Sequence, residues 1–210
     1  MTPAPPHPAP AEPAGRTVAV VLAGGTSRRF GTDKLAHPVA GRPLLDHTLA
    51  GLPADVDVVL VGPVRPTARP VVHVREEPPG GGPTAALVTG LRHALAAGAG
   101  LVLVLPGDAP GAGAGSRVLA DALRARDQDA VLGVDVEGRE QPLQLALRPA
   151  AARRLVELAG PGGGAGQSAR RLVQRLNPPA TTCPLPAAAT FDVDDRAQLD
   201  LWLDGGPAGG

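Results

Sequence analysis

The sequence contains few of the residues on which several classes of protein depend. Its single cysteine, Cys183, excludes an internal disulfide and any metal cluster built on several thiolates. Aromatic residues make up 1% of the chain and tyrosine is absent, which excludes a base-stacking surface for single-stranded nucleic acid. Lys and Arg together number 20, as do Asp and Glu, and this balance argues against a protein built to neutralise a nucleic-acid backbone.

Long apolar stretches are missing as well. No run approaches the ~20 residues that a membrane-spanning helix needs. The first 15 residues have neither the basic region nor the apolar region of a secretory signal. We therefore expect a cytoplasmic protein that binds neither a membrane nor nucleic acid.

The chain is predicted to form one domain between two tails, because 210 residues is close to the usual size of a single domain. Residues 1–15 are mostly Pro and Ala and cannot bury a core, so a disordered tail is expected there. Residues 205–210 are predicted to form a second, flexible tail. The domain itself is assigned to residues 16–204.

Apolar runs alternate with helical patterns along this domain. The runs carry apolar residues on both faces, which is typical of strands in a parallel sheet covered by helices on each side. The order predicts an α/β fold with a Rossmann-like, doubly wound, mainly parallel sheet. Strands are expected at residues 17–22, 57–61, 101–105, 130–135 and 143–147, and helices at 43–52, 83–97, 116–126, 149–158, 167–176 and 196–203. Pro43 is expected at the first helical position, and Ser116 and Ser168 as N-caps.

The loop after the first strand carries the strongest chemical signal, because ligands of such sheets bind at the carboxyl ends of strands. Residues 22–34 read LAGGTSRRFGTDK. Gly24 and Gly25 allow a sharp turn that brings backbone N–H groups close to a ligand. Arg28, Arg29 and Lys34 add three positive charges within reach of phosphate oxygens. The alternative is an ordinary turn with solvated Arg and Lys side chains.

This segment resembles the signature L-A-G-G-x-S-x-R-[FM]-G-x-D-K of nucleotidyltransferases that activate cofactors and sugars, and most closely that of the molybdenum cofactor guanylyltransferases. The resemblance covers residues 17–203. It implies a Mg²⁺-dependent enzyme that transfers GMP from GTP to the phosphate of molybdenum-molybdopterin and releases pyrophosphate. It also implies transient contact with molybdoenzymes or other proteins of cofactor biosynthesis.

Three later segments match the same family. Residues 106–110 (PGDAP) resemble its P-C-D-x-P, residues 80–86 (GGGPTAA) its G-P-L-A-G, and residues 192–194 (DVD) its N-V-N or D-V-D. The resemblance implies catalytic roles for Lys34, Arg28 and Asp108, and metal binding by Asp108 and Asp194. It places the nucleotide against Leu22, Ala23, Gly24, Gly25, Lys34, Gly62, Glu76, Gly82 and Asp108.

Each acidic residue has a structural alternative. Asp108 ends a buried strand, which suits the hard-oxygen preference of Mg²⁺, but it also fits a turn before Pro110. Glu76 offers a carboxylate to the N1–H and N2–H donors of guanine, or forms a solvated pair with Glu77. Asp194 is a candidate second metal contact. The alternative is that Asp194 or Asp195 is the N-cap of the last helix, and both roles can hold at once.

The chain departs from the family at two positions. Gly107 replaces a frequent Cys, and Gly62 stands where guanylyltransferases often have Asn, which removes one side-chain contact to the nucleotide. Two other functions therefore stay open. One is a cytidylyltransferase, or a guanylyltransferase that acts on another phosphorylated small molecule. The other is a non-catalytic chaperone that binds the nucleotide or the cofactor.

Overall fold

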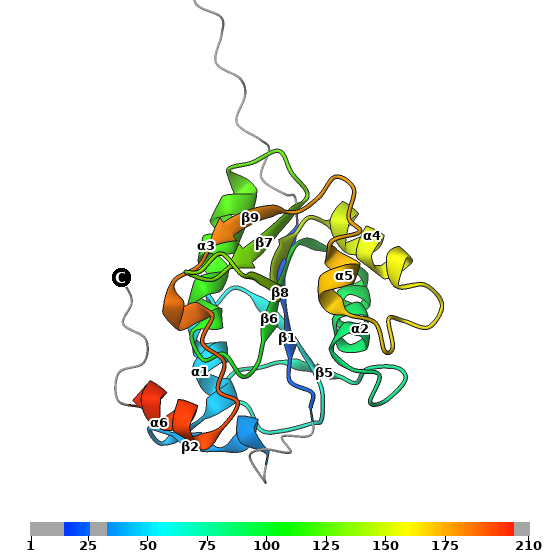
Figure 1. The fold of residues 1–210 in the computed structure, drawn as a ribbon. Helices are drawn as coiled ribbons and strands as arrows, with labels where there is room; N and C mark the ends of the chain where they lie inside the picture. Colours follow the sequence, from blue (N-terminus) through cyan, green and yellow to red (C-terminus); the bar gives the residue numbers. More distant parts are fainter. Residues whose placement is uncertain (1–14, 26–32, 204–210) are drawn as a thin grey trace, which may run out of the picture.

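The computed structural model describes residues 15–25 and 33–203 (Figure 1). Within these residues the chain forms a seven-stranded sheet, in the order β5-β4-β1-β6-β8-β7-β9, and a two-stranded hairpin. The sheet strands are β1 (Arg16–Leu22), β4 (Asp57–Val61), β5 (Val72–Val74), β6 (Ala99–Pro106), β7 (Ala130–Val134), β8 (Glu140–Leu147) and β9 (Thr181–Pro184). Among them only β8 runs antiparallel to both neighbours, so the predicted mainly parallel sheet is confirmed.

Helices cover both faces of the sheet (Figure 1). One hydrophobic core contains buried side chains of α1 (Leu44–Gly51), α3 (Ala112–Arg124) and α6 (Arg196–Leu203), and the other those of α2 (Pro83–Ala96), α4 (Pro149–Ala159) and α5 (Ala169–Val173). The shorter elements are η1 (Lys34–Ala36), η2 (Ala187–Ala189) and the hairpin of β2 (Pro38–Val39) and β3 (Arg42–Pro43). None of the helices in the described residues has the length and apolar character of a membrane span.

The central strand β1 shows why two cores form. Every residue from 18 to 21 is buried. Because successive side chains of a strand point to opposite faces, Ala19 and Val21 pack in the core of α1 and α3. Val18 and Val20 pack in the core of α2. An uninterrupted apolar run is thus what a strand buried on both faces requires.

Three predicted helix boundaries are wrong. Pro43 belongs to β3 and lies just outside α1. α3 begins at Ala112, so Ser116 lies inside the helix, where its hydroxyl donates to the Gly113 carbonyl at 2.6 Å instead of capping. The helix expected at residues 167–176 is shortened to the five residues of α5. Ser168 does cap α5, because its side-chain oxygen accepts a hydrogen bond from the Arg171 N–H at 3.4 Å.

The remainder of the chain, residues 1–14, 26–32 and 204–210, lies outside the described residues. The two predicted tails and the role of Arg28 therefore stay predictions.

Candidate active site

A cleft of about 520 Å³ lies at the carboxyl ends of β1 and β6 and at the start of α2. It occupies the edge of the sheet at which ligands of such folds bind. The cleft brings together six of the residues expected to contact the nucleotide: Leu22, Gly24, Gly25, Glu76, Gly82 and Asp108. Gly82 precedes the first residue of α2 and both residues line the cleft, so the N-terminus of that helix opens toward it, an arrangement that favours negatively charged groups.

Ala23 and Gly62 lie behind this cleft and are not among the residues that line it. The Ala23 N–H donates to the Val61 carbonyl at 2.8 Å, which holds the glycine turn to the end of β4. Gly62 has φ +152°, and a Cβ at this position would overlap the Ala23 carbonyl. The missing Asn therefore has a physical reason: the two backbones approach each other too closely for a side chain.

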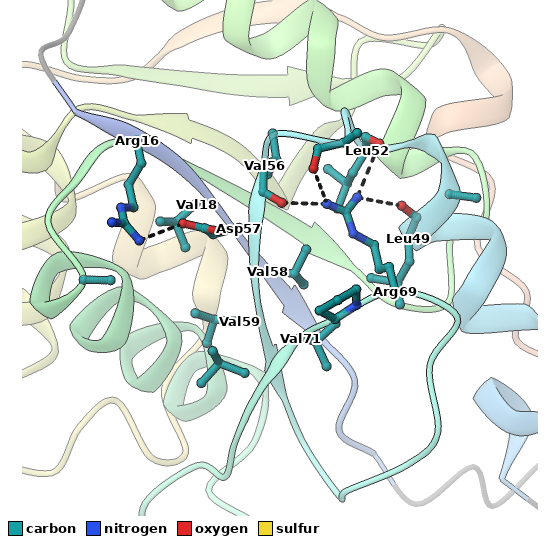
Figure 2. A pocket seen from close by; sticks show the side chains of 15 residues that line it. Arg16, Val18, Leu49, Leu52, Val56, Asp57, Val58, Val59, Arg69 and Val71 are labelled. Carbon is teal, nitrogen blue, oxygen red and sulfur yellow. Dashed lines mark hydrogen bonds and ion pairs between the residues drawn. The ribbon is translucent and has the colours of Figure 1, made fainter.

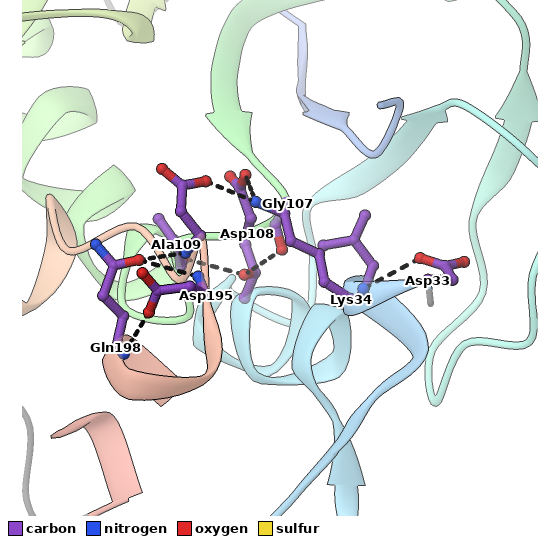
Figure 3. Close-up of polar contacts among 10 residues, drawn as sticks. Asp33, Lys34, Gly107, Asp108, Ala109, Asp195 and Gln198 are labelled. Carbon is purple, nitrogen blue, oxygen red and sulfur yellow. Dashed lines mark hydrogen bonds and ion pairs between the residues drawn. The ribbon is translucent and has the colours of Figure 1, made fainter. Parts of the chain in front are cut away.

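Lys34 joins two carboxylates that are distant in the sequence (Figure 3). Its Nζ lies 2.7 Å from Asp108 Oδ2 and 2.9 Å from Asp194 Oδ1. The side chains of Lys34 and Asp108 are 14% and 29% exposed, so water screens their contact little, whereas the Asp194 side chain is 53% exposed. The structure thus brings together three of the residues predicted to carry the chemistry, one from η1, one from the end of β6 and one from the approach to α6.

The charges of this cluster shift two pKa values. Burial disfavours the charged form of Lys34, but Asp108 and Asp194 outweigh this effect and raise the pKa of its ammonium above the ordinary value. Exclusion of water and the negative charges of Asp108 and Asp194 raise the pKa of Asp192 to about 6, while Lys34 lowers it. The Asp192 residue is nevertheless exposed, so solvent screens part of this effect. The cluster therefore holds more negative charge than one ammonium neutralises.

Asp195, rather than Asp194, caps α6 (Figure 3). The N–H of Gln198 donates to Asp195 Oδ1 at 2.9 Å, and the N–H of Asp195 donates to Gln198 Oε1 at 3.1 Å. This reciprocal pair is a capping box. Gln198 Oε1 also accepts from the Asp194 N–H at 2.6 Å, which leaves the Asp194 carboxylate to Lys34. Of the two acids considered at this helix start, one has the structural role and the other points into the site.

The turn that carries Asp108 is held by a buried threonine that the sequence did not reveal. Thr48 Oγ1 lies 3.2 Å from the Gly107 carbonyl oxygen and 3.0 Å from that of Ala109. The Asp108 carbonyl accepts from the Val193 N–H at 3.0 Å, which ties the turn to the segment before α6. A side chain at Gly107 would meet the Leu22 carbonyl at 2.9 Å, so this departure from the family also permits a close approach.

Glu76 lines the cleft and is half-buried, so it does not form a fully solvated pair with Glu77. One carboxylate oxygen, Oε1, accepts from the Gly80 N–H at 3.1 Å. The other oxygen is buried and makes no hydrogen bond to the described residues. A buried acceptor without a partner in a cleft is available to ligand N–H groups.

Fold and site together define an α/β protein whose cleft is lined by a glycine turn and a helix N-terminus, beside two carboxylates that meet at one lysine. The family model of the MobA-like NTP transferase domain matches residues 19–180. The chain belongs to this family and is a nucleotidyltransferase.

Relatives agree with this assignment. The chain is 37% identical over 162 residues to a molybdenum cofactor guanylyltransferase of Acidiphilium cryptum, covering 72% of this chain and 78% of that protein. The molybdopterin-guanine dinucleotide biosynthesis protein A of Archaeoglobus fulgidus superposes with a TM-score of 0.66 at 18% identity, over 89% of this chain and 97% of that one. The 2-C-methyl-D-erythritol 4-phosphate cytidylyltransferase of Thermus thermophilus gives 0.63 at 23% identity, over 89% and 97%. The two superpositions establish the shared fold.

Removing the Thr48 hydroxyl should disturb the site more than the fold. Thr48→Val keeps the side-chain shape but removes the donor that joins the Gly107 and Ala109 carbonyls on either side of Asp108. We expect kcat/KM for nucleotide transfer to fall about 10-fold to 100-fold, and the free energy of unfolding by about 1–2 kcal/mol. Steady-state kinetics and urea unfolding measure the two effects. Thr89→Val, at a buried threonine on α2, is the control; equal losses in both variants would contradict a specific role for Thr48.

The raised pKa of Asp192 should make the metal-free protein less stable as the pH rises. Between the ordinary value of 3.8 and about 6 the folded chain binds a proton that the unfolded chain has released, so stability falls across this interval. After allowance for solvent screening, we expect the free energy of unfolding between about pH 4 and pH 7 to fall about 1 kcal/mol more in the wild type than in Asp192→Asn. Urea unfolding in EDTA measures this difference. Asp200→Asn, at an exposed acid on α6, should follow the wild type.

Proposed function

We propose that the chain transfers GMP from GTP to the phosphate of molybdenum-molybdopterin and releases pyrophosphate. The 37% identity to a molybdenum cofactor guanylyltransferase supports the choice of substrates. The observation that carries the chemistry is the convergence of Lys34, Asp108 and Asp194 beside the glycine turn.

In this reaction an oxygen of the acceptor phosphate attacks the α-phosphorus of GTP. The bond from the α-phosphorus to the bridging oxygen of the β-phosphate breaks, and pyrophosphate leaves with the bonding electrons. The acceptor phosphate is already ionised at neutral pH, so no side chain has to remove a proton. Catalysis then depends on positioning the two phosphates and on stabilising their negative charge.

The paired carboxylates fit a divalent cation. Asp108 Oδ2 and Asp194 Oδ1 both lie within 2.9 Å of one ammonium nitrogen, so their oxygens already converge on one positive charge. Mg²⁺ is commonly held by one or two carboxylates together with substrate phosphates. We assign Asp108 and Asp194 to Mg²⁺, which when bound neutralises negative charge on the phosphates.

The other residues bind and orient the donor. We assign the backbone N–H groups of Gly24 and Gly25, which line the cleft, to the phosphates. Lys34 supplies a positive charge that stabilises the departing pyrophosphate. The buried oxygen of Glu76 is an acceptor for the N1–H and N2–H groups of guanine, which adenine does not offer. Arg28 is assigned to the pyrophosphate by the family pattern alone.

A donor panel tests the substrate assignment. With α-³²P-labelled nucleotides, Mg²⁺ and molybdenum-molybdopterin, we expect turnover with GTP to exceed that with CTP at least ~10-fold and to stop in EDTA. Asp108→Asn keeps the size of the side chain and serves as the inactive control. A preference for CTP would identify a cytidylyltransferase. Binding of GTP without turnover by the wild type would identify a carrier or chaperone.

Substitution of Lys34 separates binding from catalysis. Lys34→Ala removes a charge that acts most strongly on the departing pyrophosphate, so we expect kcat to fall about 100-fold or more and KM for GTP to change less than about fivefold. Initial-rate kinetics over a range of GTP concentrations measure both constants. An effect confined to KM would show that Lys34 only binds the ground state.

A further inference from the structure

Arg65 connects the two segments that flank the predicted phosphate-binding region. It lies in the connection between β4 and β5, and its side chain is 9% exposed. Nη1 donates to the Ala23 carbonyl at 2.7 Å, and Nη2 donates to Asp33 Oδ2 at 2.8 Å. Ala23 immediately precedes the Gly24 turn and Asp33 immediately precedes Lys34, so one planar guanidinium spans from the end of β1 to the start of η1.

Asp33 carries this contact on to Lys34. Its second oxygen, Oδ1, accepts from the Leu35 N–H at 3.1 Å and caps η1. Lys34 is the first residue of η1 and reaches Asp108 from there. A continuous set of contacts therefore runs from Arg65 through Asp33 and η1 to the lysine of the active site.

The energetics favour a geometric role for this pair. Transfer of a guanidinium out of water costs free energy, and its pairing with a carboxylate offsets that cost without adding much net stability. Arg65 Nε is also buried without a hydrogen-bond partner among the described residues, so the site does not satisfy all its donors. What the planar group supplies is two donors in a fixed relative orientation.

A second arginine in the same connection provides the comparison (Figure 2). The guanidinium of Arg69 donates to backbone carbonyls at and beyond the end of α1, including those of Leu49 at 3.3 Å and Val56 at 2.6 Å. These contacts satisfy carbonyls of a helix C-terminus, a structural role. Arg69 lines a different cavity, which contains none of the residues of the cleft.

We propose that Arg65 is a positioning residue for the nucleoside triphosphate: together with Asp33 it sets the position of Lys34 relative to the Gly24 turn. Arg65 acts through the backbone and through Asp33, not by contact with the acceptor. It governs the affinity for the triphosphate and pyrophosphate groups. The identity of the base and of the acceptor rests on the proposed function, whereas the pyrophosphate effect does not.

The test compares Arg65→Met, Arg65→Lys and Asp33→Asn with Arg69→Met. We expect Arg65→Met to raise KM for GTP and weaken pyrophosphate binding about tenfold, while KM for the acceptor changes less than twofold. Arg65→Lys keeps the charge but cannot make both contacts in the same plane, so it should recover only part of the affinity. Arg69→Met should lower the Tm and leave pyrophosphate affinity unchanged.

Coupling between Arg65 and Asp33 gives a second readout. If the two act as one unit, the double variant Arg65→Met/Asp33→Asn binds pyrophosphate no more weakly than Arg65→Met alone. Calorimetric titration of pyrophosphate needs no turnover, so it decides the inference even if guanylyl transfer itself is not observed. If Arg65→Met does not fold, Asp33→Asn, which keeps the cap and the side-chain size, decides it.

Two results would overturn the proposal. One is a loss of Tm in Arg65→Met like that in Arg69→Met with unchanged pyrophosphate affinity, which would make Arg65 purely structural. The other is a change confined to KM for the acceptor, which would place Arg65 at a different part of the reaction.

Discussion

A single buried ammonium group makes the arrangement of this site possible. Asp108 and Asp194 come from the end of β6 and the approach to α6, and two carboxylates brought this close would repel each other without a cation between them. Lys34 supplies that cation at 2.7 and 2.9 Å. The capping box at α6, the threonine behind Asp108 and the guanidinium behind η1 each hold one of these three segments in place.

The remaining imbalance of charge has a chemical meaning. Two carboxylates and one ammonium leave a net negative charge, and together with burial this charge raises the pKa of the neighbouring Asp192 to about 6. A site with excess negative charge and oxygen donors receives a divalent cation, and the cation in turn makes the site receptive to phosphates. The glycine turn alone has no side-chain oxygens with which to hold such a cation.

Much of this organisation follows from the sequence. The runs with apolar residues on both faces predict strands buried on both sides, and Asp108 is conspicuous because it closely follows one of them. The hydrogen bonds from Thr48 to Gly107 and from Arg65 to Ala23 leave no such pattern in the sequence. Their acceptors are backbone carbonyls that lie 59 and 42 residues away. Because every residue has a backbone carbonyl, neither residue type nor periodicity predicts which one will accept such a hydrogen bond. The assignment of the α6 cap to Asp195 was within reach, since a Gln three residues later marks a capping box. The start of α3 was not, because its first four residues, AGAG, have no apolar periodicity and lie close against α1.

The reversed direction of β8 has a further effect. Because β8 runs antiparallel to both neighbours, its first residues lie at the edge where β6 and β7 end, and Leu143 reaches the cleft from there. The tight turn that joins β7 to β8, closed by the Gly138 N–H donating to the Asp135 carbonyl, consequently sits at the catalytic edge. Because the turn lies between two strands that pair with each other, an insertion there would lengthen this edge beside the cleft without altering strand order. It is a place where members of one fold can diverge in the molecules they accept while the phosphate chemistry stays the same.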